Sequence, residues 1–447
     1  MKRIALQNLV RWNESPRRKP LILRGVRQVG KTWLMKEFAE RFFAQRNIYI
    51  NFDEEPRWAS VFEKTHDPEA ILRDIRFTTG RQINDDWLLI LDEVQGCPNA
   101  IHALKYFCEN KPQLRVIAAG SLLGLALAQP ESYPVGKVEF LSLEPMSFEE
   151  FLWASGEDGL VEALRQWCRI EPLTDILYAR LLEAFQKFEV IGGMPEAVSA
   201  WVDGGDMTLA RKIQKQILDT YLADIRTHSN SFDAPKIVRI WESLPRMLAR
   251  EQKKFQYSIV EEKSNARKYR DSLQWLINAR LVRPVHRIDG MGVPLSAYKD
   301  ANAFKIYLVD VGLLCRLSGL DPALLREYDE NFREHKGALA ENLVLQSLVP
   351  QFENEPLYWS MNNPPHEVDF LIERKGKIIP IEVKSGTNLK SKSLSKFKEL
   401  YKERIALRVR FSLANLSLDG DILNIPLFMA DETDRLIGMA LDEMANR

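Results

Sequence analysis

The sequence predicts an α/β protein with several domains, the first of which holds a parallel sheet covered by helices. Two observations lead to this prediction. Short apolar runs alternate with helical patterns over residues 1–150, and a chain of 447 residues is too long for a single hydrophobic core. The composition, 45% hydrophobic and 28% charged, provides enough apolar material for packed interiors.

The first expected strand is the apolar run at residues 20–24, which stops at a glycine-bounded loop. A helix is expected next at residues 33–43, where apolar side chains recur at helical spacing. Three more strands are expected at residues 47–52, 87–91 and 114–119, with helical stretches between them. Strands that alternate with helices predict parallel strands with helices on both faces of the sheet.

The rest of the chain divides by pattern into a helical connector or lid, a winged-helix-like unit and a second α/β domain, at residues 151–232, 233–325 and 326–447. The connector has apolar residues at helical spacing and breaks at the Gly-Gly-Met-Pro sequence of residues 192–195. The winged-helix-like unit shows two helices and then short strands. The last domain opens with an expected helix at residues 338–348, followed by strands rich in Val and Ile.

A glycine-rich motif indicates a phosphate-binding loop. The sequence GVRQVGKT, residues 25–32, matches Gly-x-x-x-x-Gly-Lys-Thr and lies between an expected strand and an expected helix. Its backbone N–H groups and the helix N-terminus favour phosphate, while Lys31 is expected to reach the β- and γ-phosphates and Thr32 to bind Mg²⁺. The motif therefore predicts a site for ATP with Mg²⁺. Its expected binding residues are Gly25, Val26, Arg27, Gln28, Val29, Gly30, Lys31, Thr32 and Trp33.

An acidic pair supplies the second part of such a site. The expected strand at residues 87–91 runs directly into Asp92 and Glu93. Asp92 is expected to hold the Mg²⁺ shell, and Glu93 to orient or deprotonate the attacking water. An acidic pair by itself is more often a helix cap or a solvated turn, but beside a phosphate-binding loop it predicts ATP hydrolysis. Ser121, after the strand at 114–119, is expected either to contact the γ-phosphate or the attacking water, or to cap the next helix.

Two carboxylates near the C-terminus form a second candidate site. Asp369 and Glu382 each end an apolar run, and a hairpin would bring them together. Lys384 shares a strand face with Glu382, and Glu341 on the preceding helix would complete a shell of oxygen ligands for Mg²⁺. Such a set serves metal-dependent cleavage of phosphodiesters. The spacing alone favours the other interpretation, a salt bridge at the surface of a hairpin.

Charge and composition narrow the classes of partner. The 62 basic and 62 acidic residues balance, so binding to nucleic acid must use local patches. Residues 374–410 carry twelve Lys or Arg against three Glu, which fits either a phosphate backbone or a solvated helix face. Arg267, Lys268 and Arg270 on the winged-helix-like unit leave the same choice between nucleic acid and a protein partner.

Other classes of site and location are disfavoured. The four cysteines lack metal or disulfide spacing, and the six histidines include no metal-binding pair. The chain lacks a signal-peptide pattern and a long apolar run, so we expect a cytoplasmic protein without a membrane partner. An oligomer remains compatible with the sequence.

The order of motifs resembles that of a large prokaryotic family. GVRQVGKT, LLILDEVQ, GSLLGLAL with PVGKVEFLSLEPMSFEEFL, GGMPEAV, FKIYLVDVGLL, GALAENLV and EVDF…IPIEVKSG follow in that family's order along nearly the whole chain. The family joins an AAA-type ATP-binding domain to a C-terminal domain of unknown function that resembles PD-(D/E)xK restriction-endonuclease-like folds. The resemblance implies a P-loop NTPase sheet, a helical and winged-helix segment, and a restriction-endonuclease-like α/β domain. It also implies that Glu341, Asp369, Glu382 and Lys384 form the E…D…ExK set.

The chain departs from that family at one position. Lys137 stands where the family commonly has an arginine, and lysine cannot reproduce the bidentate fork with which arginine contacts a γ-phosphate. Arg27 and Arg115 are alternatives without further support. Two functional hypotheses follow: an ATPase whose nucleotide state controls a nuclease-like module acting on nucleic acid, and a nucleotide-dependent switch that binds a protein partner without cleaving anything. A remodelling ring is a third, less favoured because the chain has one P-loop.

Overall fold

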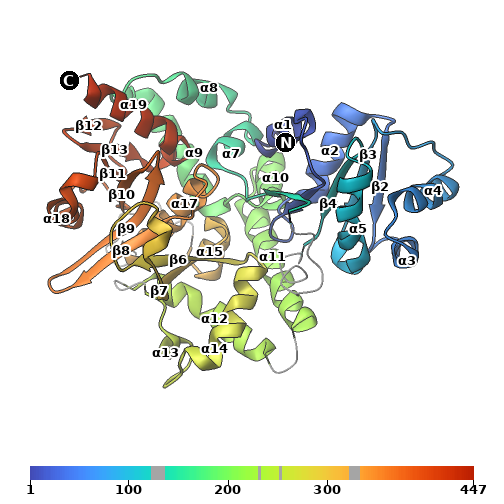
Figure 1. Cartoon of the computed structure of the whole chain (residues 1–447). Coiled ribbons are helices and arrows are strands. Elements are labelled where there is room, and N and C mark those ends of the chain that lie inside the picture. Colours follow the sequence, from blue (N-terminus) through green and yellow to red (C-terminus); the bar gives the residue numbers. More distant parts are fainter. Residues whose placement is uncertain (122–135, 230–232, 251–253, 322–332, 447) are drawn as a thin grey trace. The chain divides into compact units, whose positions relative to one another are not determined.

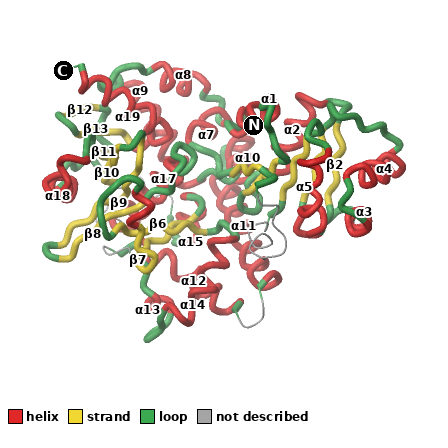
Figure 2. The backbone as a smooth tube through the Cα atoms, viewed as in Figure 1, coloured by secondary structure: helices red, strands yellow, loops and turns green. Residues whose placement is uncertain are grey.

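The computed structural model describes residues 1–121, 136–229, 233–250, 254–321 and 333–446. The chain forms two compact units (Figure 1). The first contains Met1–Glu144 and Gln274–Leu281, and the second contains Pro145–Leu273 and Val282–Arg447. In each unit strands form one sheet and helices pack beside it (Figure 2).

The first unit is built on a five-stranded sheet in which every pairing is parallel, as the sequence predicts. The strand order is β2-β3-β4-β1-β5. The strands are β1 (Leu21–Arg24), β2 (Asn47–Asn51), β3 (Leu88–Asp92), β4 (Arg115–Ala119) and β5 (Glu139–Ser142). All five residues of β3 are buried, which explains its uninterrupted apolar sequence. The sequence analysis named four of these strands; β5 is a four-residue edge strand without a fully buried residue, so its apolar signal is weak.

The helices of this unit are α1 (Ala5–Glu14), α2 (Lys31–Phe43), α3 (Ala59–Lys64), α4 (Pro68–Thr79) and α5 (Pro98–Asn110). Helix α2 shows how the sequence sets them. Gly30, with φ of 94°, precedes its first residue, and Leu34, Met35 and Phe38 form its buried face. A continuous core made mainly of Ile, Leu, Val and Phe side chains joins α3, α4 and α5 to strands β1 to β4.

Helices open the second unit between residues 148 and 228, where the sequence analysis expects a connector at residues 151–232, and further helices follow along the chain. They are α7 (Phe148–Ala154), α8 (Asp158–Gln166), α9 (Asp175–Ile191), α10 (Pro195–Gly204), α11 (Met207–His228), α12 (Ala234–Leu248), α13 (Tyr257–Val260), α14 (Ala266–Asn278, whose last residues belong to the first unit), α15 (Val311–Leu317), α17 (Arg333–Leu348), α18 (Lys392–Tyr401) and α19 (Thr433–Ala445). Helix α7 starts with a reciprocal capping box between Ser147 and Glu150.

The second unit has a mixed sheet of eight strands in the order β12-β13-β11-β10-β9-β8-β6-β7. Its strands are β6 (Val282–Ile288), β7 (Lys299–Leu308), β8 (Leu357–Asn362), β9 (Pro365–Arg374), β10 (Lys377–Val383), β11 (Arg408–Ser412), β12 (Ser417–Asp419) and β13 (Ile422–Pro426). Strand β6 pairs with β7 on one side and with β8 on the other. One sheet therefore joins strands from both sides of the boundary expected at residue 325.

Two glycines explain why the Gly-Gly-Met-Pro sequence breaks the helical pattern. Helix α9 ends at Ile191, and the next residue, Gly192, has a φ of 71°, which is unfavourable for other residues. A Cβ on Gly193 would lie 2.1 Å from the carbonyl oxygen of Met146. The backbone N–H of Gly193 donates to Asp310 Oδ2 at 2.6 Å. Asp310 belongs to the Asp-Val-Gly motif that starts α15, so the structure joins two motifs far apart in sequence.

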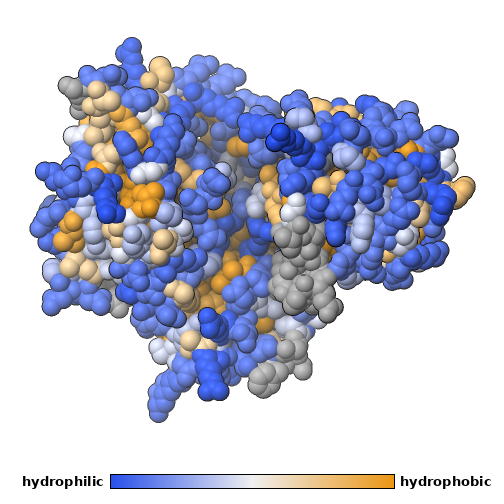
Figure 3. Space-filling view, viewed as in Figure 1, coloured by the Kyte–Doolittle hydropathy of each residue, from blue (hydrophilic) through white to orange (hydrophobic). Residues whose placement is uncertain are grey.

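Hydrophilic side chains dominate the face drawn in Figure 3, with smaller hydrophobic patches between them. Within the described ranges, no helix is both long and apolar enough to cross a membrane.

Candidate nucleotide site and a buried charge cluster

The Gly25–Thr32 loop connects the end of β1 to the start of α2. Gly25 is required by packing, because a Cβ there would lie 2.5 Å from the carbonyl oxygen of Leu143. Gln28 and Gly30 have φ values of 64° and 94°, so the backbone turns through left-handed conformations before the helix. Such a turn directs successive N–H groups into one concave surface that favours anions. The geometry matches the sequence prediction of a phosphate-binding loop.

Lys31 lies inside this loop. Its ammonium donates hydrogen bonds to the carbonyl oxygens of Gly25 at 3.0 Å and Val26 at 2.9 Å. Burial lowers the pKa of Lys31 to about 8, although the carboxylates of Glu93 and Asp92 act in the opposite direction. The loop thus holds a cationic group whose charge is sensitive to its surroundings.

Asp92, the last residue of β3, meets Thr32 at the start of α2. The Thr32 hydroxyl donates to Asp92 Oδ2 at 2.7 Å, and the Tyr49 hydroxyl donates to the same oxygen at 2.9 Å. Burial raises the pKa of Asp92, while these two hydrogen bonds favour its carboxylate form. A hydroxyl and a carboxylate in contact at the edge of a phosphate loop are suitable oxygen ligands for Mg²⁺. The sequence did not identify Tyr49.

Glu93 is held by Ser121. The Ser121 hydroxyl donates to Glu93 Oε1 at 3.1 Å, while its backbone N–H and the Gln95 amide donate to Oε2 at 3.2 and 2.6 Å. Glu93 itself has a left-handed backbone, with φ of 51°. Ser121 therefore contacts the expected catalytic carboxylate, a partner that the sequence analysis did not name for it. The helix that it was expected to cap falls in residues 122–135, outside the described residues.

The remaining residues of the motif frame the loop. Val26 and Val29 are buried, whereas Trp33 on the first turn of α2 is 39% exposed. Arg27 acts on Lys31 electrostatically, disfavouring its protonated form.

The parallel register decides which basic residues lie at the edge that carries the loop. Arg115 begins β4, and Lys137 precedes β5, so both lie at the amino ends of strands, opposite the carboxyl ends from which the loop and Asp92 emerge. Lys137 forms an ion pair with Glu109 at 2.9 Å. Arg280 instead donates to Ser142 Oγ at 3.0 Å, and Ser142 pairs with Arg24 immediately before the loop. Sequence reasoning missed Arg280, which lies more than a hundred residues from the motif.

The C-terminal carboxylates surround a lysine that the sequence analysis did not name. Lys305 on β7 is fully buried, and its ammonium lies 2.5 Å from Glu367 Oε1, 3.8 Å from Asp369 Oδ1 and 3.9 Å from Glu341 Oε2. Burial alone would lower the pKa of Lys305, but the three carboxylates outweigh burial and raise it. Lys305 is therefore a buried cation.

The β9–β10 hairpin brings the predicted residues into one region, as expected. Asp369 Oδ2 accepts a hydrogen bond from the backbone N–H of Val383 at 2.8 Å, next to Glu382. Lys384 donates to Glu382 Oε1 at 2.5 Å. Burial raises the pKa of Glu382, and Lys384 opposes that effect. Among the described residues, no group of three or more His, Cys, Asp or Glu side chains is arranged to hold a metal ion.

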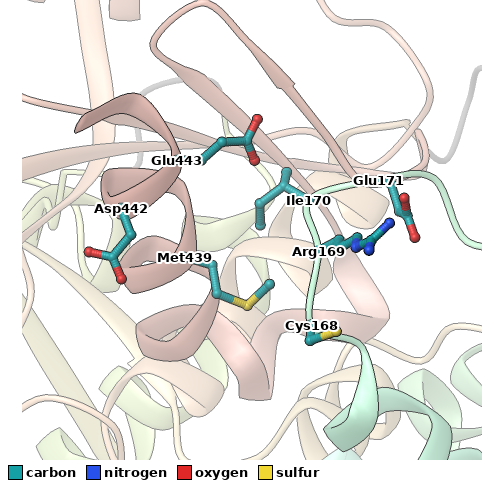
Figure 4. A pocket seen from close by; sticks show the side chains of 7 residues that line it. All are labelled: Cys168, Arg169, Ile170, Glu171, Met439, Asp442 and Glu443. Atoms are coloured by element: carbon teal, nitrogen blue, oxygen red, sulfur yellow. The ribbon is translucent and has the colours of Figure 1, made fainter. Parts of the chain in front are cut away.

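A separate cavity of about 460 Å³ lies between α19 and the segment before α9 (Figure 4). Its lining residues are Cys168, Arg169, Ile170, Glu171, Met439, Asp442 and Glu443. None of them belongs to a site expected from the sequence.

Comparison with known families agrees with the geometry of the first unit. Residues 17–152 match the model of a family described as an AAA domain. This stretch is an AAA-type P-loop domain. Residues 182–324 and 336–428 match two families described as domains of unknown function, DUF8612 and DUF4143, and neither description names a nuclease. The nuclease-like identity expected for the C-terminal domain thus receives no support from these matches.

One similar protein matches much of the chain, and another matches a shorter part. The uncharacterized protein MJ1544 of Methanocaldococcus jannaschii is 22% identical over 363 residues, which cover 80% of this chain and 72% of that protein. The uncharacterized protein Rv2008c of Mycobacterium tuberculosis is 29% identical over 127 residues, covering 28% of this chain and 26% of that protein.

Among solved structures, the Walker-type ATPase paby2304 of Pyrococcus abyssi is similar at 15% identity, covering 70% of this chain and 94% of that one with a TM-score of 0.44. The Aeropyrum pernix Orc1 protein in complex with DNA is similar at 15% identity, covering 73% and 94% with a TM-score of 0.31.

Proposed function

We propose that this protein is a Mg²⁺-dependent ATPase whose nucleotide state controls what its C-terminal part binds. The observation that carries the proposal is the grouping of four side chains where parallel strands end: Lys31, Thr32, Asp92 and Glu93. In this proposal Lys31 binds the phosphates, and Glu93 orients the attacking water and accepts its proton. Thr32 and Asp92 would hold Mg²⁺, which neutralises phosphate charge when bound.

The contacts around Glu93 support a role as general base rather than as a structural cap. Ser121 and Gln95 fix both carboxylate oxygens, so the side chain has a defined orientation. The residue also adopts a backbone conformation that is uncommon for glutamate, and such conformations concentrate at functional sites. A residue that only ended β3 would need neither feature.

The test is ATP turnover in wild type, Glu93→Gln and Lys31→Ala, with equilibrium binding of ATP measured in parallel. We expect Glu93→Gln to keep ATP binding and lose turnover, whereas Lys31→Ala loses both. Turnover that survives in Glu93→Gln would contradict the assignment of the base. Absence of turnover in wild type, despite ATP binding, would leave a nucleotide-gated binding protein.

For the C-terminal part we propose a binding role, in which the ATPase acts as a switch for a protein partner. Much of the basic excess at residues 374–410 is engaged internally. Arg408 and Lys398 pair with Asp421, and Arg410 is buried against Asn424. This internal pairing leaves less positive charge for a phosphate backbone than the sequence count suggests.

One observation favours nucleic acid as a second candidate partner. A cavity of about 450 Å³ at the start of α18 is lined by three lysines together with His366, Ser391, Ser395 and Glu399. The lysines are Lys390, Lys392 and Lys396. We therefore propose measuring ATP turnover with and without DNA or RNA in wild type and in Lys390→Glu/Lys392→Glu. ATP turnover that DNA or RNA stimulates in wild type but not in the double variant would support nucleic acid as the partner. ATP turnover that neither DNA nor RNA changes would support the protein-partner switch.

A further inference from the structure

We propose that the Lys305 ammonium is the resident cation of the C-terminal carboxylate cluster, so that Glu341, Asp369 and Glu382 do not take up a divalent metal in the native protein. The E…D…ExK set implied by resemblance calls for Mg²⁺ at these residues. The side chains around them are those of an ion-pair cluster with its own built-in positive charge. This inference is independent of the ATPase proposal, because it concerns other residues.

The position of Lys305 is the first step of the argument. The side chain is fully buried, and its ammonium lies between carboxylates from two separate elements: Glu341 on α17, and Glu367 and Asp369 on β9. Its distances of 3.8 and 3.9 Å to Asp369 and Glu341 place it in the space that separates two of the proposed metal ligands. The ring of Tyr358, centred 5.0 Å from the ammonium, also favours a cation there.

The second step concerns the oxygens themselves. Asp369 Oδ2 accepts from Val383 N–H, Glu341 Oε2 accepts from the Tyr307 hydroxyl at 2.8 Å, and Glu382 Oε1 accepts from Lys384. Each proposed ligand thus already has an internal donor. Glu382 Oε2 is buried without a hydrogen-bond partner. This oxygen could therefore contribute to binding a cation if Lys305 were removed.

The third step is exclusion by charge and space. Oxygen ligands hold Mg²⁺ at about 2.0–2.1 Å, so an ion shared by Asp369 and Glu341 would lie next to the ammonium. Two cations at such close range repel strongly where water does not screen them. Lys305 cannot swing into solvent without leaving a fully buried position and three carboxylates, and breaking a buried ion pair is strongly unfavourable.

The experiment is a Mn²⁺ titration followed by electron paramagnetic resonance, with the full chain free of nucleotide. Each protein carries Thr32→Ala, which removes a ligand of the proposed nucleotide-site metal. We expect no Mn²⁺ site that depends on Asp369 in the parent. Lys305→Ala should gain one site, with a Kd at least about tenfold below the highest Mn²⁺ concentration at which the parent shows none. The matched control is Lys384→Ala, which removes a lysine from the same cluster but leaves Lys305 in place, and it should gain no site.

Two results would overturn the inference. Mn²⁺ binding by the parent that disappears in Asp369→Asn would show that the cluster accepts a metal beside Lys305. A folded Lys305→Ala protein that gains no Mn²⁺ site would show that the lysine does not occupy a cation position. If Lys305→Ala fails to fold, the parent and Asp369→Asn titrations still decide the matter, and a rise in the yield of folded Lys305→Ala with Mn²⁺ would support the inference.

Discussion

The hydroxyl of Thr32 donates a 2.7 Å hydrogen bond to the carboxylate of Asp92. The two residues are sixty positions apart in sequence. They meet because β1 and β3 run in the same direction, so that α2 starts at the sheet edge where β3 ends. This contact is the geometric core of the proposed Mg²⁺–ATP site.

Replacing Thr32 should weaken the dependence of the proposed ATP turnover on Mg²⁺. Thr32→Ala removes both the hydroxyl ligand and the donor that orients Asp92, so we expect the apparent Mg²⁺ affinity to fall about 10- to 100-fold. Thr32→Ser retains the hydroxyl and is the matched control. The measurement is ATP turnover as a function of Mg²⁺ concentration, and equal curves for both variants would contradict the assignment.

Ser121 should act on the chemical step through Glu93. Ser121→Ala removes one of the donors that fix the Glu93 carboxylate but leaves the backbone N–H and Gln95. A loss of about 1 kcal/mol corresponds to roughly a fivefold lower kcat, with KM unchanged. Steady-state kinetics distinguish this from a direct phosphate contact, which would raise KM as well.

Alanine substitutions of Arg280 and Lys137 should have different effects on ATP turnover. Arg280 contacts Ser142 at the edge that carries the phosphate loop, and its charge opposes protonation of Lys31, whereas Lys137 lies at the other edge beside Glu109. We expect Arg280→Ala to reduce ATP turnover about tenfold or more, and Lys137→Ala to leave it within about twofold. Equal effects of the two substitutions would contradict the inference that only Arg280 lies at the sheet edge that carries the phosphate loop.

The pH dependence of nucleotide affinity follows from Lys31. Because burial lowers its pKa to about 8 in the nucleotide-free protein, its ammonium is lost as pH rises through that value. Phosphate binds the protonated form, so affinity is highest below pH 8 and falls above it by at most about tenfold per pH unit. Binding of a non-hydrolysable ATP analogue from pH 6.5 to 9.5 checks this. Lys31→Arg, whose charge persists over this range, should give a flatter profile.

Gly193 should be sensitive to a single methyl group. A Cβ there would lie 2.1 Å from the Met146 carbonyl oxygen and would displace the N–H that binds Asp310. We expect Gly193→Ala to lower the free energy of unfolding by about 1–3 kcal/mol or more, measured in urea. Gly204→Ala is the control, because a Cβ at Gly204 meets no atom within 4 Å.

Structural features could be predicted from the sequence where their pattern lies within one short stretch of residues. The phosphate-binding loop is contiguous, and β3 is buried on both faces, so both are visible as short patterns. By contrast, β5 is short and half-exposed, and its place beside β1 follows only from pairing across more than a hundred residues.

The same limit explains the residues that were missed. Tyr49, Arg280 and Lys305 reach their sites through strand pairing and packing, and none of them stands in a motif that fixes its partner. Asp369 and Glu382 were expected to approach one another, and the hairpin does bring them close. Because Lys305 lies among the carboxylates, we interpret their proximity as an ion-pair cluster and not as a metal site.

The pairing of β6 with both β7 and β8 determines where the chain can be divided into fragments. A fragment that stops at residue 325 would keep β6 and β7 but lose β8, exposing a strand edge that invites aggregation. The reverse fragment, beginning at residue 326, would also lack Lys305 and so would bury three carboxylates without their cation. We therefore expect that the C-terminal third does not fold correctly as a separate fragment. Fusion proteins that include it should contain the chain from β6 onward.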